Sequence, residues 1–584
     1  MSAYRIVRRG AHGALAKAFV LGALALASAL VTAQPTPPPD AGQLLRETRD
    51  PIRLPPRTGS DLLPKPPTPA PALAPQPKLR VTVSRFTFTG NTLYSETVLQ
   101  ELVKEFVGKS LDFNELNDVV TKVRAYHRER GYFLAQAYLP QQAIRGGVVQ
   151  IAVIEGRVGI LELNRRAASR LSERMLAGII SSHIAEGDLI TETGLERPLL
   201  LINDLPTAVV ASEIRRSKTI GAADLRINVD QADDLIGGDV EYDNHGTRFT
   251  GEQRRGAAFN LNNPSGLGDQ FSFRGFNTDE AMWYARLSYL VPVGYYGTRI
   301  GVSYTRFDYA LTTSEFIALL ANGEGEVKSI YGFHPIVRTR NTNVIFQFSY
   351  EEKRLIDRVD STNTFTDRNI GIAKGGLVGD FRDGLLGGGL NAYTANVSVG
   401  HHGLAPTAAV LADNDTTTGG HSTQGKFIKY NVEARRLQRV SDTTSLLLSL
   451  TMQRASKNLA SAEKFSIGGP NAVRAYPVAE GSGDEGKVFQ TELRYVWPGF
   501  RPLGGDFTLS GFWDWGESKL IRNPNAADAP NYRSIAGYGF GVSIGREGNF
   551  RLSGTVAWIG DQETPKADAV NRVPRVWVQA IKYF

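Results

Sequence analysis

The feature that most constrains this chain is a repeated alternation of polar and apolar side chains, which runs from about residue 239 to residue 584. In the segment 426–435, for example, positions 428, 430, 432 and 434 are apolar, whereas the positions between them carry Lys429, Asn431, Glu433 and Arg435. Because successive side chains on a strand point to opposite faces, such a segment has one apolar and one polar wall. We predict a membrane β-barrel of about 16 antiparallel strands, since a closed sheet leaves no backbone group unpaired in lipid.

The first 33 residues have the features of a secretory signal peptide. They contain four basic residues and no acidic one, then an apolar run at 18–30 and small residues before a cleavage site after Ala33. The apolar run is too short for a membrane helix, which needs about twenty residues. Cleavage lowers the formal net charge from +7 to +3, which removes most of the support for nucleic-acid binding. An exported barrel is expected in the bacterial outer membrane.

The segment 34–78 is rich in proline and is expected to be an extended linker. Within it, Ala41–Arg49 is the only part with helical character, and its sequence is compatible both with a short helix and with a disordered tail. The whole chain lacks cysteine, which excludes disulfides, thiolate metal sites and cysteine nucleophiles.

Between the linker and the barrel, the chain predicts two similar β-α-α-β-β units. In the first unit, a strand at Val81–Thr89 precedes a helix capped by Ser95, and Asp112 with Glu115 forms a variant capping box for a second helix. Two further strands are expected in this unit, at 132–139 and 148–154. The second unit is expected to have strands at 158–163, 208–215 and 224–229 and helices at 172–181 and 195–203. An exposed strand edge in such units can accept an extended peptide by β-augmentation.

Several motifs suggest chemistry, but their context argues against a catalytic or cofactor site. Gly541–Gly545 matches the G-x-S-x-G pattern of hydrolases, yet it lies in an alternating strand and is not followed by a histidine. His401 and His402 point to opposite faces of a strand and are interpreted as barrel-end residues. The glycine runs at 375–379 and 387–389 lack the lysine of a phosphate-binding loop and are predicted to be turns. Four tryptophans are predicted to belong to the aromatic belt: Trp283, Trp497, Trp558 and Trp577.

Short motifs occur along nearly the whole mature chain in a fixed order. They are Gly131-Tyr132, Leu139-Pro140-Gln141 and Glu155-Gly156 in the first unit, Leu195-Glu196-Arg197 and Asn203-Asp204-Leu205-Pro206 in the second, and Tyr242-Asp243-Asn244-His245-Gly246 and 262–269 in the barrel. Their order resembles the TpsB transporters of two-partner secretion, of the hemolysin/hemagglutinin secretion-activator type. The resemblance implies two POTRA domains, 79–156 and 157–231, before a barrel at 232–584.

Two further motifs imply a functional site. Val473, Arg474, Ala475 and Tyr476 resemble the Val-Arg-Gly-Tyr/Phe motif that the family carries in its sixth extracellular loop, and Phe512, Asp514 and Gly516 resemble its Phe-x-Asp-x-Gly strand motif. In the family, the loop arginine pairs with the strand aspartate, which implies an Arg474–Asp514 pair in the lumen. Ala475 stands where the family has glycine, which leaves the conformation of the loop tip open.

The resemblance implies a pore that binds an unfolded secreted partner, similar to a TpsA protein, through its periplasmic POTRA domains and passes it to the cell surface. In the family a helix before the linker occupies the lumen, and Ala41–Arg49 is the candidate here. No enzyme activity, cofactor or nucleic-acid partner is expected. The alternatives are a barrel-assembly factor, which usually has more POTRA domains, and a passive porin, which has none.

The last strand is expected at Arg575–Phe584, where the alternation is poor and the sequence does not say which face meets lipid. Outer-membrane proteins of this type resemble one another in ending on phenylalanine, which implies that the barrel-assembly machinery reads Phe584. Phe584 as one apolar packing contact among many is the other interpretation.

Overall fold

The computed structural model describes residues 38–48, 80–166, 169–231, 235–417, 419–526, 528–568, 570 and 572–584. The expected signal peptide and most of the expected linker lie outside these residues. None of the helices in the described ranges is both long and apolar enough to cross a membrane.

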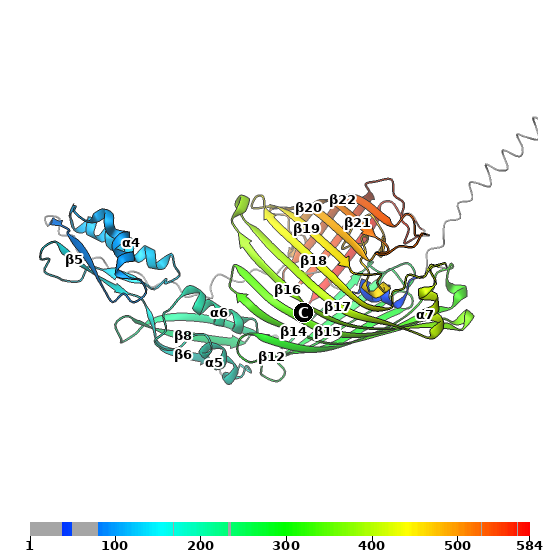
Figure 1. The fold of residues 1–584 in the computed structure, drawn as a ribbon, viewed down its shortest axis with the longest axis horizontal. Helices are drawn as coiled ribbons and strands as arrows, with labels where there is room; N and C mark the ends of the chain where they lie inside the picture. Colours follow the sequence, from blue (N-terminus) through cyan, green and yellow to red (C-terminus); the bar gives the residue numbers. More distant parts are fainter. Residues whose placement is uncertain are drawn as a thin grey trace, which may run out of the picture. The chain divides into compact units, whose positions relative to one another are not determined.

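Sixteen antiparallel strands, β9 to β24, form a closed barrel, as predicted (Figure 1). Each strand pairs with the next along the chain, and β24 pairs with β9 to close the sheet. The strands are β9 (Ile236–Asp243), β10 (Arg254–Asn262), β11 (Gln270–Thr278), β12 (Met282–Val293), β13 (Thr298–Ala310), β14 (Ala321–Arg338), β15 (Thr342–Val359), β16 (Thr364–Asp383), β17 (Gly389–Ala405), β18 (Gly425–Arg439), β19 (Thr444–Ala455), β20 (Glu485–Val496), β21 (Asp506–Lys519), β22 (Tyr532–Arg546), β23 (Phe550–Ile559) and β24 (Arg575–Tyr583).

The alternation in sequence separates the outside of the barrel from its interior. On β18, Ile428, Tyr430 and Val432 are exposed on the outer face, whereas Lys429 between them is buried in the interior. Such an outer wall of apolar side chains suits lipid, and the polar inner wall suits a lumen. The G-x-S-x-G sequence lies within β22, so it lacks the strand–turn–helix setting of a hydrolase nucleophile.

Two predictions about the barrel wall were wrong. The glycines at 375–379 lie inside β16 and not in a turn; a side chain on Gly376, for example, would approach Asn396 of the neighbouring strand to 2.2 Å. Trp577 does not belong to the aromatic belt, because it is buried at 5% exposure on the inner face of β24. Trp283 and Trp497 are exposed, and Trp558 stacks on the exposed ring of Tyr538.

The first of the two expected POTRA units packs two helices against a three-stranded sheet. Strand β2 (Arg85–Thr89) is parallel to the central β5 (Val148–Ile154), and β4 (Gln136–Tyr138) is antiparallel to it. A separate pair, β1 (Val81–Thr82) and β3 (Ser110–Leu111), interrupts the long strand expected from the sequence. The helices are α3 (Glu96–Val103), followed by a short 3-10 turn, and α4 (Phe113–Arg128).

The caps predicted for these helices are present. Ser95 accepts a hydrogen bond from the Val98 backbone, and Asp112 and Glu115 form a reciprocal capping box on α4. Strand β4 is shorter than expected because the residues after α4 form a turn, in which the Tyr132 N–H donates to His127 O and the Ala135 N–H donates to Tyr132 O.

The second expected POTRA unit repeats this arrangement. Strand β6 (Arg157–Arg165) is parallel to the central β8 (Ala222–Gln231), and β7 (Ala208–Arg216) is antiparallel to it. Helices α5 (Glu173–Ser181) and α6 (Glu192–Asn203) cover this sheet with a buried aliphatic core. The end of α6 contacts a barrel turn, where Arg338 donates to both carboxylate oxygens of Asp204 at 2.6 and 2.8 Å. Because the resemblance implies that the two units lie in the periplasm, we expect this contact at the periplasmic end of the barrel.

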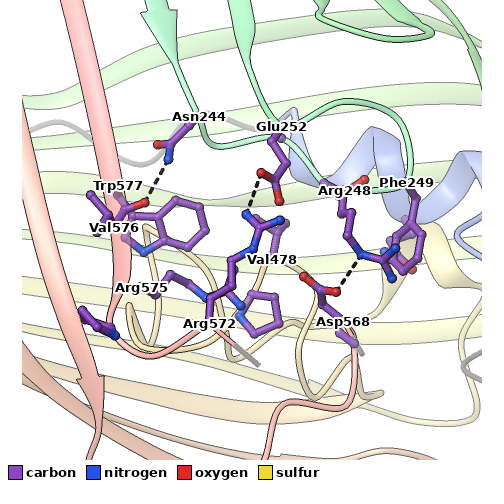
Figure 2. A pocket seen from close by; sticks show the side chains of 16 residues that line it. Asn244, Arg248, Phe249, Glu252, Val478, Asp568, Arg572, Arg575, Val576 and Trp577 are labelled. Carbon is purple, nitrogen blue, oxygen red and sulfur yellow. Dashed lines mark hydrogen bonds and ion pairs between the residues drawn. The ribbon is translucent and has the colours of Figure 1, made fainter. Parts of the chain in front are cut away.

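The seam that closes the barrel is short. Five residue pairs join β24 to β9. Phe584 extends the pairing, because its N–H donates to Gly238 O at 3.1 Å and its carbonyl accepts from the Gly238 N–H at 3.0 Å. At the other end of the seam, the side chain of Asn244 donates to Val576 O and accepts from the Val578 N–H (Figure 2). The amide of Asn244 therefore continues the backbone ladder by one step.

Candidate functional site

The chain between β19 and β20, residues 456–484, folds back into the barrel; we call it the lumen loop. Its side chains Ile467, Val473, Ala475 and Tyr476 are buried together with inward-facing residues of the wall. The wall residues of this cluster are Val488 on β20, Phe512 on β21, Ile535 on β22 and Ala557 on β23. Burial of this apolar surface stabilises the loop inside the barrel rather than above it.

The side chain of Arg474 in the lumen loop makes three hydrogen bonds to two carboxylates of the barrel wall. Its Nε and Nη2 donate to the two carboxylate oxygens of Asp514, both at 2.8 Å, and its Nη1 donates to Glu492 at 2.6 Å. The backbone N–H of Arg474 also donates to Asp514, at 3.2 Å. Because Asp514 is 0% exposed, this two-point pair is shielded from water and fixes both position and orientation.

Two aromatic residues complete the surroundings of Arg474. The guanidinium carbon lies 3.4 Å from the ring centre of Phe512, a cation–π contact. The indole N–H of Trp577 donates to the Arg474 carbonyl at 2.8 Å, which explains why this tryptophan points inward. The motif residues Arg474, Phe512 and Asp514 are thus in contact. Glu492 and Trp577 belong to the same cluster, although the sequence had not indicated a role for either of them here.

Small residues let the loop tip approach the wall. An added Cβ at Gly516 would lie 3.0 Å from Ile467, and one at Gly537 would lie 2.5 Å from the Ala475 Cβ. Ala479 of the lumen loop has a positive φ, whereas Ala475 does not. The loop tip therefore does not require glycine at position 475, and the glycine that this contact requires is on the wall, at position 537.

The lumen loop also forms hydrogen bonds with the segment between β23 and β24. The Tyr476 hydroxyl donates to Asp561 at 2.6 Å and lies 2.8 Å from the Glu563 carbonyl oxygen. Glu480 is buried, accepts from Arg533 of β22 at 2.9 Å, and accepts from the backbone N–H groups of Lys566 and Ala567. These contacts had no signal in the sequence, since the partners are far apart along the chain.

Glu463 anchors the other half of the lumen loop. Its carboxylate is 0% exposed and accepts from Lys353 of β15 and Lys429 of β18, each at 2.6 Å. Glu351 lies 3.2 Å from Lys353, so the two buried lysines face two carboxylates. Buried charges that are paired in this way avoid the desolvation penalty of isolated ones.

The helix α2 (Ala41–Glu47) lies against this anchor. Asp40 caps it by accepting from the Gln43 N–H at 2.9 Å, and its first amide, at Ala41, donates to Asp357 of β15 at 2.7 Å. Arg46 donates to the carbonyl of Ser461 at 3.1 Å and to Ser482 at 2.9 Å, both in the lumen loop. The helix therefore touches the wall with one end and the loop with the other.

The described residues contain no group of three or more His, Cys, Asp or Glu side chains able to hold a metal ion. His402 is buried on the inner face of β17 near Thr423, with 3.3 Å between Nδ1 and Oγ1. The arrangement is suited to holding a loop and a helix in a pore by charge pairing.

Comparison with known proteins decides the family. The model of the "Haemolysin secretion/activation protein ShlB/FhaC/HecB" family matches residues 221–544, and the "POTRA domain, ShlB-type" model matches residues 81–156. The chain belongs to this family. Its members are transporters, and the chain is an outer-membrane pore of two-partner secretion, with POTRA domains in the periplasm.

Individual relatives cover most of the chain. "Heme/hemopexin transporter protein HuxB" of Haemophilus influenzae is 26% identical over 83% of this chain and 84% of its own length. "Outer membrane transporter CdiB" of Dickeya dadantii is 23% identical over 79% and 80%. Among solved structures, CdiB from Escherichia coli has a similar fold, with a TM-score of 0.68, 21% identity and coverage of 89% of this chain and 94% of that chain.

Proposed function

We propose that the Arg474–Asp514 pair holds the lumen loop in the conformation needed for secretion of one large, TpsA-like partner protein. The observation that supports this most is the saturation of one guanidinium by two carboxylates inside the barrel, Asp514 at 2.8 Å and Glu492 at 2.6 Å. Val473, Ala475 and Tyr476 pack the loop tip, and Phe512 and Gly516 give it a matching wall.

The unfolded partner is proposed to bind first at the edges of the POTRA sheets. Strand β4 lies at the edge of the first sheet and β7 at the edge of the second. An extended segment of the partner can add to such an edge by main-chain hydrogen bonds. The two periplasmic domains proposed here are 79–156 and 157–231. The linker that carries α2 is 34–78, and the barrel is 232–584.

Replacing Arg474 with alanine is expected to abolish most secretion while the barrel still inserts. The change leaves Asp514 buried without its partner, which costs about 3–5 kcal/mol for a buried pair and releases the loop tip. Arg439→Ala is the matched control, because Arg439 is the exposed last residue of β18, at the periplasmic end of the strand, and pairs with the exposed Asp442. The partner protein is measured in the medium, and the barrel in outer-membrane fractions. Normal secretion by a fully inserted Arg474→Ala variant would refute the proposed role.

We further propose that α2 plugs the resting pore. Asp40, Ala41 and Arg46 dock it on Arg368, Asp357 and the lumen loop, and an added Cβ at Gly42 would lie 2.4 Å from Ser461 Oγ, so the fit is close.

Deleting residues 34–78 is therefore expected to raise the conductance of single pores in planar bilayers, because it removes the helix from the lumen. Gly42→Leu should raise conductance in the same direction, since leucine cannot fit at the contact with Ser461. Gln142→Leu, a change in the first POTRA domain outside the lumen, serves as the control for leucine substitution. Unchanged conductance in both the deletion and Gly42→Leu would rule out a plug.

Phe584 is proposed to be read by the barrel-assembly machinery during insertion. Phe584 is 62% exposed as a residue, so contacts within the barrel cover only part of it: its ring lies beside Gly238, and its backbone pairs with Gly238 in the seam. Phe584→Ala keeps these two backbone bonds and removes the ring. We expect this variant to lower the amount of heat-modifiable, inserted barrel severalfold, nearly as much as deletion of Phe584. Wild-type insertion by Phe584→Ala, with loss only on deletion, would leave a purely structural role in the seam.

A further inference from the structure

Three turns of the barrel carry exposed apolar side chains at the periplasmic end, opposite helix α7 (Thr407–Asn414) (Figure 1). They connect β16 to β17, β18 to β19 and β20 to β21. The second POTRA domain bonds to other turns, since Ser172 donates to Gly266 O and Arg340 donates to Glu196. The exposed apolar residues of the three turns, which we call the rim patch, are Leu385, Leu386, Val440, Trp497, Phe500 and Leu503.

Two leucines of the rim patch are held in a backbone conformation that suits glycine. Leu386 has a φ of 51° and Leu503 a φ of 56°, and each is followed by two glycines in the sequence. This left-handed conformation is costly for a residue with a Cβ, whereas glycine adopts it freely. Leu386 is 80% exposed and Leu503 is 72% exposed, so packing within the described fold repays little of that cost.

The turn between β16 and β17 is folded onto the lipid-facing side of the wall. Gln438 lies on the same face of β18 as the exposed residues at 428, 430 and 432, yet it is itself buried. Its Nε2 lies 3.2 Å from Leu385 O and 3.0 Å from both Leu386 O and Gly388 O. The carbonyl groups of the turn therefore cover an outward-pointing side chain, and the turn faces away from the lumen.

The turn between β20 and β21 lies on the same side. The ring of Phe500 is 5.0 Å from that of Phe507, which shares the outer face of β21 with the exposed Trp513. Phe500 also lies 6.3 Å from Trp497, which is exposed as expected for the aromatic belt. Such belts sit at the level of the lipid headgroups. The rim patch is thus continuous with the lipid-facing surface.

Ionic side chains beside the rim patch are paired with one another. Arg436 donates to Asp383 at 2.6 and 3.0 Å, and Arg501 donates to Asp506 at 2.6 and 3.0 Å. Paired charges are less costly to bring toward lipid than isolated ones. The surroundings of the patch therefore suit the boundary between lipid and water.

We propose that the rim patch binds phospholipid in the headgroup region of the periplasmic leaflet, with Leu386 and Leu503 as its anchors. Contact with lipid removes the exposed leucine side chains from water, which supplies the stabilisation that packing within the fold does not. An unfolded segment of the secreted partner would also suit apolar side chains. Its path leads into the lumen, however, whereas both turns face outward.

The test uses single cysteine labels, because the chain has no cysteine of its own. Full-length Leu386→Cys and Leu503→Cys are labelled with the fluorophore NBD and placed in liposomes of phosphatidylethanolamine and phosphatidylglycerol. Quenching by nitroxide-labelled lipid is compared with quenching by iodide, which is present on both sides of the membrane. Val432→Cys on the outer wall is the reference for lipid, and Ile220→Cys, in the exposed turn between β7 and β8, is the reference for water.

At both leucine positions we expect lipid quenching severalfold stronger, and iodide quenching severalfold weaker, than at Ile220→Cys. Leu385→Cys, in the same exposed turn, replaces Leu386→Cys if that variant does not insert. Quenching by iodide and lipid equal to that at Ile220→Cys would overturn the proposal. Loss of iodide quenching only after addition of reduced, carboxymethylated α-lactalbumin, an unfolded polypeptide, would also overturn it and would assign the patch to the secreted partner.

Discussion

The position of the lumen loop inside this barrel depends on pairing charges away from water. Arg474 and Asp514 form the clearest case, because the carboxylate is fully buried and both of its oxygens are used by one guanidinium. An isolated charge in that position would cost several kcal/mol. The loop is therefore stable inside the barrel only when Arg474 pairs with Asp514. Glu463 with Lys353 and Lys429, and Glu480 with Arg533, repeat the same solution along the loop.

These ion pairs hold the lumen loop in position, and the loop in turn holds helix α2. Helix α2 has seven residues, which is too short to be stable alone in water. It gains its order from the contacts of Arg46 with Ser461 and Ser482, next to the Glu463 anchor, and from Asp357 on the wall. The helix and the loop therefore share one support, and movement of the loop removes half of the docking site of the helix.

The sequence predicted the architecture well because its signals are local and periodic. Alternation in the strands indicated the barrel and the number of its strands, and Asp112 with Glu115 indicated the start of α4. The last strand was ambiguous for a physical reason: Trp577 is apolar although it points inward, and its indole N–H donates to the Arg474 carbonyl of the lumen loop. A period-two pattern weakens where an inward-facing side chain packs against protein and not against water.

The site was only partly predictable for a different reason. Arg474 and Asp514 carried family motifs, whereas Glu492, Asp561 and Arg533 sit in strands and loops with no distinguishing neighbours. Their roles arise from three-dimensional proximity, as for Tyr476 and Asp561, which are 85 positions apart in the chain.

The coupling energy between Arg474 and Asp514 tests the central claim most directly. It is obtained from a double-mutant cycle of Arg474→Ala, Asp514→Ala and the double variant, with the free energy of unfolding of the inserted barrel as the measured quantity. Residues in one buried network typically couple by about 0.5–3 kcal/mol, and we predict a favourable coupling at the upper end of that range. Additivity of the two substitutions to within about 0.5 kcal/mol would contradict the account, since independent sites behave in that way.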